Sequence, residues 1–206
     1  MTDTKGRGRR GYHHGNLRAA LIEATRALIA EKGVAGVTIA DAARRAGVSA
    51  AAPYRHFESR DALIGATAEA GFARFADRLT AAWDDGRPSP LAAFEATGRA
   101  YLAFAREEPE YYAAMFDPSL PPAESADAGR AFEILRRAAE RLIESLPPER
   151  RPPVHMVALH VWALSHGIAG LFAVPGGGAR SPIPAEELLE SAIGVYLRGL
   201  GLLDRT

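Results

Sequence analysis

Apolar side chains recur along this chain at intervals of three and four residues, the spacing that places them on one face of an α-helix. Runs of such positions, punctuated by Gly, Pro and Ser, predict a series of helices. Their expected ranges are 17–32, 38–46, 49–57, 59–85, 91–106, 109–116, 123–146, 153–174 and 185–201. Alanine is abundant, β-branched residues are few and strand-like alternation is hard to find. The pattern therefore predicts an all-α fold.

Two of these predicted helices are short and are separated by a glycine. Thr38 can cap the first one, with Asp41 in its first turn favouring the positive end of the helix. Gly47 follows, where a helix would end in the left-handed conformation, and Ser49 can cap a second helix that ends near Phe57. This arrangement predicts a helix-turn-helix, a motif that usually enters the major groove of DNA. Many helical proteins contain the same geometry without binding nucleic acid, so the motif alone does not establish that function.

The formal net charge of zero hides an uneven distribution. Residues 1–60 hold 11 Lys and Arg against 5 Asp and Glu, whereas the remaining residues hold 14 against 20. A basic N-terminal part beside an acidic remainder fits a DNA-binding head on a body that avoids polyanions. Chance asymmetry on solvated faces is the alternative, and the charge split alone does not decide between the two.

The run from 17 to 63 resembles the DNA-binding domain of tetracycline-repressor-type (TetR family) regulators, over about a quarter of the chain. Its most specific part is GVSAAAPYRHFESRDAL at 47–63, in which Arg60 stands where the family more often has Lys. The tracts WALSHG at 162–167 and FAREEPEYYAAMF at 104–116 resemble, less specifically, the Trp-His-Gly (WHG) subgroup of TetR-type C-terminal domains. The resemblance implies a three-helix, homeodomain-like helix-turn-helix head on a helical-bundle domain for ligand binding and dimerisation.

We expect three parts in the chain. Residues 1–11 form a disordered basic arm, 12–60 the helix-turn-helix DNA-binding domain, and 61–206 the helical ligand-binding and dimerisation domain. The arm is rich in Lys and Arg that can lie along phosphates or in the minor groove, with a solubilising tail as the alternative. The long helix predicted from Ser59 joins head to body without a flexible linker, so a shift in the body can reach the head.

The residues expected at the DNA offer hydroxyls, cations, an imidazole and small apolar groups. They are Thr38, Arg44, Arg45, Ser49, Ala50, Ala51, Pro53, Tyr54, Arg55, His56 and Arg60. Four of them are expected from the family resemblance to contact the DNA backbone: Thr38, Tyr54, His56 and Arg60. The alanine methyl groups can touch thymine methyl groups and let the protein backbone approach the groove closely. Phosphate contacts position a protein on DNA, whereas base contacts specify the sequence. Few of these residues can read bases, so they do not determine the operator sequence.

Most aromatic residues beyond the head are expected in the core by default. A regulated DNA-binding protein also needs an apolar pocket with a few polar groups, and a subset of these residues can line it. The candidates are Tyr101, Phe104, Tyr112, Met115, Phe116, Trp162 and His166. We expect a small apolar or amphipathic effector there.

Residue patterns of enzymes and metal proteins are hard to find. The chain has no cysteine, no Gly-x-Ser-x-Gly elbow and no Walker-type phosphate loop. No two histidines lie four residues apart, as a helical zinc site would require. We therefore expect no catalytic residue, no metal and no cofactor. No apolar run approaches the length of an uninterrupted membrane span, so we expect a cytoplasmic protein without membrane contact.

These observations favour a homodimeric transcriptional regulator that binds a double-stranded, near-palindromic DNA operator and is released by a ligand, which makes it a repressor. The last two helices of each copy are expected to form the dimer interface, with Gly167 and Gly170 allowing close approach. A regulator of the same fold without small-molecule control is the first alternative. A helical enzyme on the same scaffold and a structural adaptor are the others.

Overall fold

The computed structural model describes residues 17–120, 125–174 and 181–203, and these residues form eight α-helices without a strand. The all-α prediction is confirmed. The basic arm and the residues at 12–16 lie outside the described residues. The α-helices are α1 (Leu17–Lys32), α2 (Ile39–Arg45), α3 (Arg60–Trp83), α4 (Pro90–Glu107), α5 (Pro109–Met115), α6 (Ala126–Ile143), α7 (Val154–Ile168) and α8 (Ala185–Leu200).

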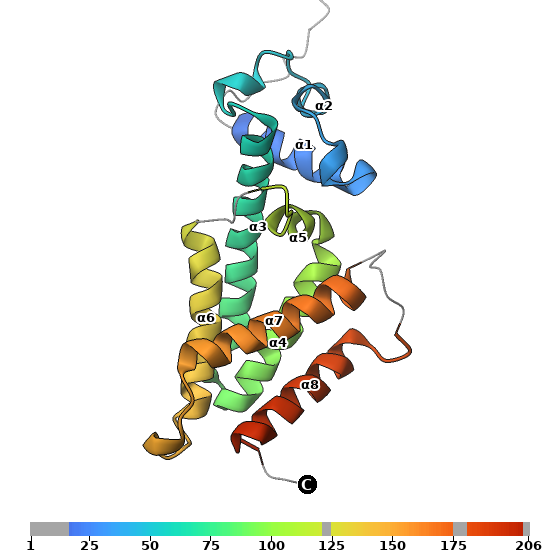
Figure 1. Cartoon of the computed structure of the whole chain (residues 1–206). Coiled ribbons are helices and arrows are strands. Elements are labelled where there is room, and N and C mark those ends of the chain that lie inside the picture. Colours follow the sequence, from blue (N-terminus) through green and yellow to red (C-terminus); the bar gives the residue numbers. More distant parts are fainter. Residues whose placement is uncertain (1–16, 121–124, 175–180, 204–206) are drawn as a thin grey trace, which may run out of the picture.

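The head consists of α1, α2 and a compact turn that leads into α3 (Figure 1). The Thr38 side chain caps α2 as predicted, because its Oγ1 accepts a hydrogen bond from the Asp41 N–H at 3.1 Å. Gly47 has φ +71°, the left-handed conformation in which only glycine avoids strain. These two residues fix where α2 begins and where the turn after it bends.

The second half of the helix-turn-helix differs from the prediction. We expected a helix over 49–57, but the structure has turns followed by the short 3-10 helix Pro53–Arg55. Pro53 has no N–H to donate to the Ser49 carbonyl, so the first α-helical hydrogen bond is absent. Tighter bonds replace it, with Ala52 N donating to Ser49 O at 3.0 Å and His56 N to Pro53 O at 2.9 Å.

The long helix α3 connects the head to the body, as predicted. Its N-terminus is capped by Ser59, whose Oγ accepts from the Ala62 N–H at 3.0 Å. Leu63 and Ile64 are fully buried near its start, as are Phe75 and Ala76 about three turns further on. At 1.5 Å per residue, its 24 residues give a rod of about 36 Å. Figure 1 shows α3 running from the head down between α6 and the remaining body helices.

In the body, α4, α5 and α6 pack around α3, and α7 and α8 lie side by side across them (Figure 1). One continuous apolar core extends from Leu21 in α1 to Leu197 in α8. The helix predicted over 153–174 is α-helical only as far as Ile168. It then continues as a π-helical segment, Ala169–Ala173, in which the Val174 N–H donates to the Ala169 carbonyl at 3.1 Å.

The stretch Val154–Ala173 is apolar and long enough to cross a bilayer by length and composition, with a mean hydropathy of 1.5. The sequence-based expectation was that no apolar run reaches the length of an uninterrupted span, and His and Ser residues do interrupt this one. In the structure, one side of α7 packs against α6 and α8. The other side of α7 carries exposed apolar residues.

Candidate nucleic-acid interface and buried cavity

The residues expected at the DNA form a largely exposed surface on the head. Exposed side chains belong to Thr38, Arg44, Arg45, Ser49, Ala50, Ala51, Tyr54, Arg55 and His56. Tyr54 is the most exposed aromatic residue among them, at 61%. The expected DNA contacts are therefore sterically accessible.

Two of the exposed cations are held in ion pairs on the head. Arg44 bonds to Asp41 one turn earlier, and Arg45 Nη1 lies 2.6 Å from Glu31 Oε1 of α1. Lys32 also bonds to Asp41, and its side chain is the largest cause that lowers the pKa of Asp41 to about 2. Exposed pairs of this kind contribute little to stability, so the arginines can exchange a carboxylate for a phosphate.

Pro53 is the exception among the expected contacts. Its ring is buried in the head, so it shapes the turn and does not face outward. The prediction that Pro53 offers a surface to DNA does not fit this position.

Arg60 is also used differently from the sequence-based expectation of a phosphate contact. Its Nε donates to the Val37 carbonyl at 2.9 Å and its Nη2 to the Val34 carbonyl at 2.6 Å. Its Nη1 bonds to Asp61 Oδ1 at 2.9 Å. The guanidinium therefore ties the start of α3 to the turn before α2. Sequence reasoning missed this role because the carbonyl partners lie 23 and 26 positions away and carry no side-chain signal.

In the body, two tyrosines and a histidine from the expected effector site meet. Tyr112 Oη lies 2.8 Å and Tyr101 Oη 3.2 Å from Nδ1 of His166. Burial lowers the pKa of His166 and raises that of Tyr112 to about 12, and burial also raises the pKa of Tyr101. At neutral pH the imidazole is therefore neutral, and its Nδ1 can accept a hydrogen bond from one of the two hydroxyls, of which that of Tyr112 is the nearer.

The expected effector residues form an aromatic cluster in which the rings pack on one another. The Phe116 and His166 ring centroids are 4.4 Å apart, and those of Tyr101 and Trp162 are 5.9 Å apart. Phe104 is 1% exposed and packs on Phe75 in the core. The side chains of this cluster therefore fill the space between them.

The cavity lies beside that cluster, between α4, α7 and α8, with a volume of about 150 Å³. Of the seven expected effector residues, Tyr101 and Trp162 line it. Met115 and Phe116 instead line a separate open groove between α3 and α5, and the other three line neither space. Most of the cavity wall is apolar and comes from several helices: Leu79, Phe94, Leu135, Val161, Leu189, Ile193 and Leu197.

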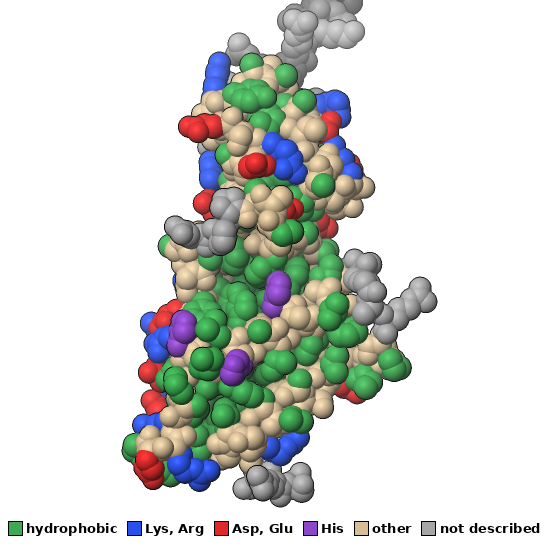
Figure 2. Space-filling model, in the orientation of Figure 1, with side chains coloured by type: hydrophobic (Ala, Val, Ile, Leu, Met, Phe, Trp, Pro, Cys, Tyr) green, Lys and Arg blue, Asp and Glu red, His purple; other side chains and the backbone are tan. Residues whose placement is uncertain are grey.

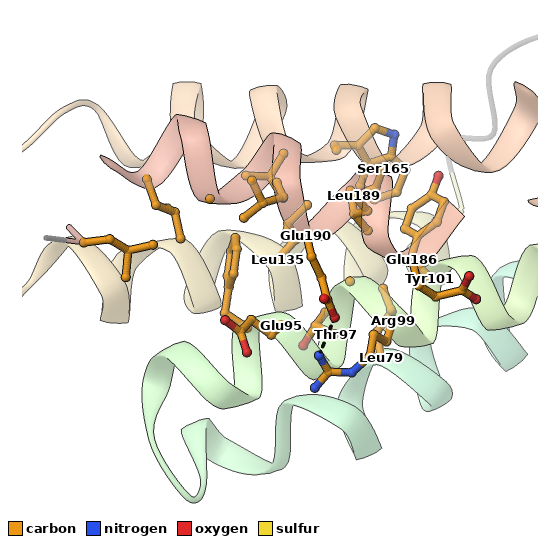
Figure 3. Close-up of a pocket in the computed structure, with 18 residues that line it drawn as sticks. Leu79, Glu95, Thr97, Arg99, Tyr101, Leu135, Ser165, Glu186, Leu189 and Glu190 are labelled. Carbon is orange, nitrogen blue, oxygen red and sulfur yellow. Dashed lines mark hydrogen bonds and ion pairs between the residues drawn. The ribbon is translucent and has the colours of Figure 1, made fainter. Parts of the chain in front are cut away.

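Sequence reasoning missed most of this wall because the residues look like ordinary core positions on their own helices. The buried hydroxyl residues Thr97 and Ser165 were a possible signal, since each interrupts an apolar stripe and each lines the cavity. Figure 3 shows Thr97 on α4 and Ser165 on α7 on opposite sides of the space.

Charged residues stand at the edge of the cavity and join α4 to α8. Arg99 Nη1 lies 3.1 Å from Glu190 Oε1, a pair marked by the dashed line in Figure 3. Arg106 bonds to Glu186, one turn before Glu190 on α8, and this bond is the largest cause that lowers the pKa of Glu186. The described residues contain no group of three or more His, Asp or Glu placed to hold a metal ion.

The head geometry and the helical body together define a helix-turn-helix DNA-binding protein. Family models for the "Bacterial regulatory proteins, tetR family" and the "Tetracyclin repressor-like, C-terminal domain" match residues 21–67 and 94–196, respectively. The chain belongs to the TetR family of transcriptional regulators. The finer resemblance to the WHG subgroup stays a prediction.

Solved structures share the fold. A protein of unknown function from Rhodococcus sp. RHA1 is 31% identical, with a TM-score of 0.76, covering 92% of this chain and 98% of that one. The TetR family transcriptional regulator PfmR from Thermus thermophilus is 23% identical, with a TM-score of 0.66, covering 90% of this chain and 99% of that one. The latter shows the fold alone. No curated protein sequence matches the chain.

Proposed function

We propose that this TetR-family regulator is a ligand-released repressor that binds a near-palindromic operator as a homodimer. The observation that carries the proposal is that one rigid helix belongs to both sites. Leu79 of α3 lines the cavity, while Leu63 and Ile64 of the same helix are buried beside the head. A ligand that moves the cavity wall therefore acts on the helix that positions the head.

An exposed apolar surface on the last two helices supports the dimer. Its large side chains are exposed by 43% to 63%: Met156, Leu159, Leu171 and Val195. Figure 2 shows apolar side chains spread over α7 and α8 on the face turned to the viewer. A monomer rarely exposes such a surface to water, whereas a two-fold pairing of α7 and α8 from each copy covers it.

Two glycines on the same surface support a close approach. Gly167 and Gly170 are exposed, and a Cβ atom added at either position would meet nothing within 4 Å inside the subunit. Nothing within one copy requires glycine there. A second helix that packs directly on the backbone of α7 gives these positions a reason to lack side chains.

Repression and release follow from the linkage between the two sites. The two heads of a dimer bind successive major grooves about 34 Å apart, so their spacing must match the DNA. A ligand that binds more tightly to a body conformation with a different head spacing shifts the population away from the operator. The DNA contacts come from the exposed residues of the head and from the arm at 1–11. The head domain spans 12–60 and the body domain 61–206, in a cytoplasmic protein.

The test is to incubate the purified full chain with random genomic fragments, recover the retained DNA and sequence it. We expect a short motif with two-fold symmetry, bound by a species of twice the chain mass in size-exclusion chromatography. A strictly monomeric protein, or one that retains no duplex in dilute buffer, would rule out the proposal. A symmetric motif that no ligand releases would instead favour the regulator without small-molecule control.

A further inference from the structure

We propose that the effector is a compact neutral molecule about the size of one aromatic ring, with an uncharged polar group that bonds to Ser165. This inference rests on the proposed ligand-released function and concerns the cavity between α4, α7 and α8. Its support comes from the volume of the cavity, the chemistry of its wall and the pairing of the charges at its edge.

The volume limits the size of the ligand. The cavity measures about 150 Å³. An engineered cavity of about this volume, lined by Leu, Ile and Phe, stays dry and binds benzene. The surrounding side chains belong to the packed core, since Phe94, Val161, Leu189 and Leu197 are each less than 5% exposed. A polycyclic molecule would therefore have to displace core residues or extend through the open side of the cavity into water.

The wall excludes a charged ligand. It is formed mainly by aliphatic and aromatic side chains, which give an ion no compensation for its lost water. Ionic groups occur only at the edge, where Arg99 is paired with Glu190 and Glu186 with Arg106. Glu95 is exposed to water on α4 and offers no dry counter-ion. These charges are partly exposed and stand in water, so they give an ion held in the apolar part of the space no dry partner to replace its lost hydration.

One hydroxyl of the wall can recognise a polar group. The Thr97 hydroxyl donates to the Ala93 carbonyl at 2.9 Å, and the Tyr101 hydroxyl is directed to His166. Ser165 is 3% exposed and lines the cavity from the side of α7 (Figure 3). A ligand oxygen or nitrogen can exchange a hydrogen bond with the Ser165 hydroxyl, while its ring fills the apolar space.

A matched series of one-ring probes tests this inference on the full chain without DNA. Toluene, benzyl alcohol, benzylammonium and benzoate share one skeleton and differ in polarity and charge. We expect toluene and benzyl alcohol to raise the melting temperature, with benzyl alcohol binding more tightly. The two ions should bind at least about 100-fold more weakly because of their desolvation cost. Ions that bind as tightly as benzyl alcohol would overturn the inference.

Two variants locate the binding. Ser165→Ala should remove the preference for benzyl alcohol over toluene, about threefold to tenfold, and leave toluene binding intact. Ser145→Ala is the control, because Ser145 bonds to the Leu142 carbonyl at the end of α6, outside the cavity. If Ser165→Ala still prefers benzyl alcohol over toluene as the parent does, the assigned contact is overturned.

DNA binding separates this inference from the proposed function. The same probes are added to the complex of the dimer with its selected DNA motif, and benzyl alcohol should release it at concentrations that saturate the cavity. Neutral probes that bind but leave the complex intact would overturn the effector assignment. If the protein retains no DNA at all, the proposed function fails, while the melting-temperature series still decides what the cavity binds.

Discussion

Tyr111 and Tyr112 are neighbours in the chain, yet their hydroxyls bond to opposite parts of the molecule. Tyr111 Oη donates to Glu23 Oε1 of α1 in the head at 2.7 Å, whereas Tyr112 Oη lies 2.8 Å from His166 Nδ1 of α7 in the body. Consecutive helical residues point about 100° apart, so the short helix α5 can make both contacts. It is a second connection between head and body beside α3.

Removing the Tyr111 hydroxyl should weaken this connection without changing the core. We expect Tyr111→Phe to lower the free energy of unfolding by about 1 kcal/mol, because the ring stays and one hydrogen bond to a half-exposed carboxylate is lost. Urea unfolding followed by circular dichroism measures the change. Tyr112→Phe is the matched comparison, because it removes the neighbouring hydroxyl that contacts His166 in the body. A Tyr111→Phe protein as stable as the parent would show that the contact with Glu23 is not formed in solution.

The same contact should make part of the stability depend on pH. The hydrogen bond from Tyr111 is the largest cause that lowers the pKa of Glu23 in the folded protein. A lowered folded-state pKa stabilises above the unfolded-state pKa, and this stabilisation is lost as the pH falls through the folded-state pKa. The stability difference between the parent and Tyr111→Phe should therefore be largest near neutral pH and shrink below about pH 4.5. A difference that grows in acid would contradict this reading.

Close packing of α3 on α5 gives a prediction with an internal control. A Cβ added at Gly71 would lie 2.8 Å from Met115 Sδ and 3.1 Å from Tyr111 Cβ, whereas at Gly65 it would meet nothing within 4 Å. Gly71→Ala should destabilise the protein by about 1–3 kcal/mol through overpacking. Gly65→Ala, on the same helix, should stabilise it by up to about 1 kcal/mol. Thermal unfolding of both variants checks the opposite signs.

Local rules predicted the helices well and the sites only in part. Caps such as Thr38 and Ser59, and glycines such as Gly47, act on their own neighbours, so the sequence reveals them directly. Helical spacing likewise placed α3 and α8 within a few residues of their observed ends. The cavity is different, because it is a space enclosed by residues of several helices, mainly α4, α7 and α8. No single helix encodes that space, and its wall residues resemble core residues.

The turn over 49–57 and the contacts of Arg60 show a second limit of local reasoning. The missing N–H of Pro53 can be read from the sequence, but the length of helix that remains depends on competing turns. The family resemblance suggested a phosphate contact for Arg60, whereas its observed partners are backbone carbonyls from distant positions. Backbone acceptors are present at every residue, so sequence patterns do not identify which ones a side chain will reach.

The role of Arg60 can be distinguished from a phosphate contact by salt dependence. Losing a phosphate contact reduces the slope of log affinity against log salt by about 1, whereas losing a positioning residue lowers affinity and stability without changing the slope. We expect Arg60→Ala to leave the slope unchanged and to lower the free energy of unfolding by about 1–2 kcal/mol. Arg55→Ala, at an exposed cation of the same surface, should reduce the slope and keep the stability. Mobility-shift titrations at several salt concentrations measure the slopes. A reduced slope for Arg60→Ala would refute this assignment.

The dimer surface and the DNA surface should respond separately to one added charge. Val195 on α8 is 63% exposed and Tyr54 on the head 61% exposed, so glutamate at either position is tolerated by the isolated subunit. In a two-fold interface each substitution occurs twice, and Val195→Glu would bury one carboxylate from each copy in the apolar contact. We expect Val195→Glu to give monomers and lose operator affinity, and Tyr54→Glu to remain dimeric and lose operator affinity alone. Analytical ultracentrifugation of both variants decides the matter, since a dimeric Val195→Glu protein would move the interface away from this part of α8.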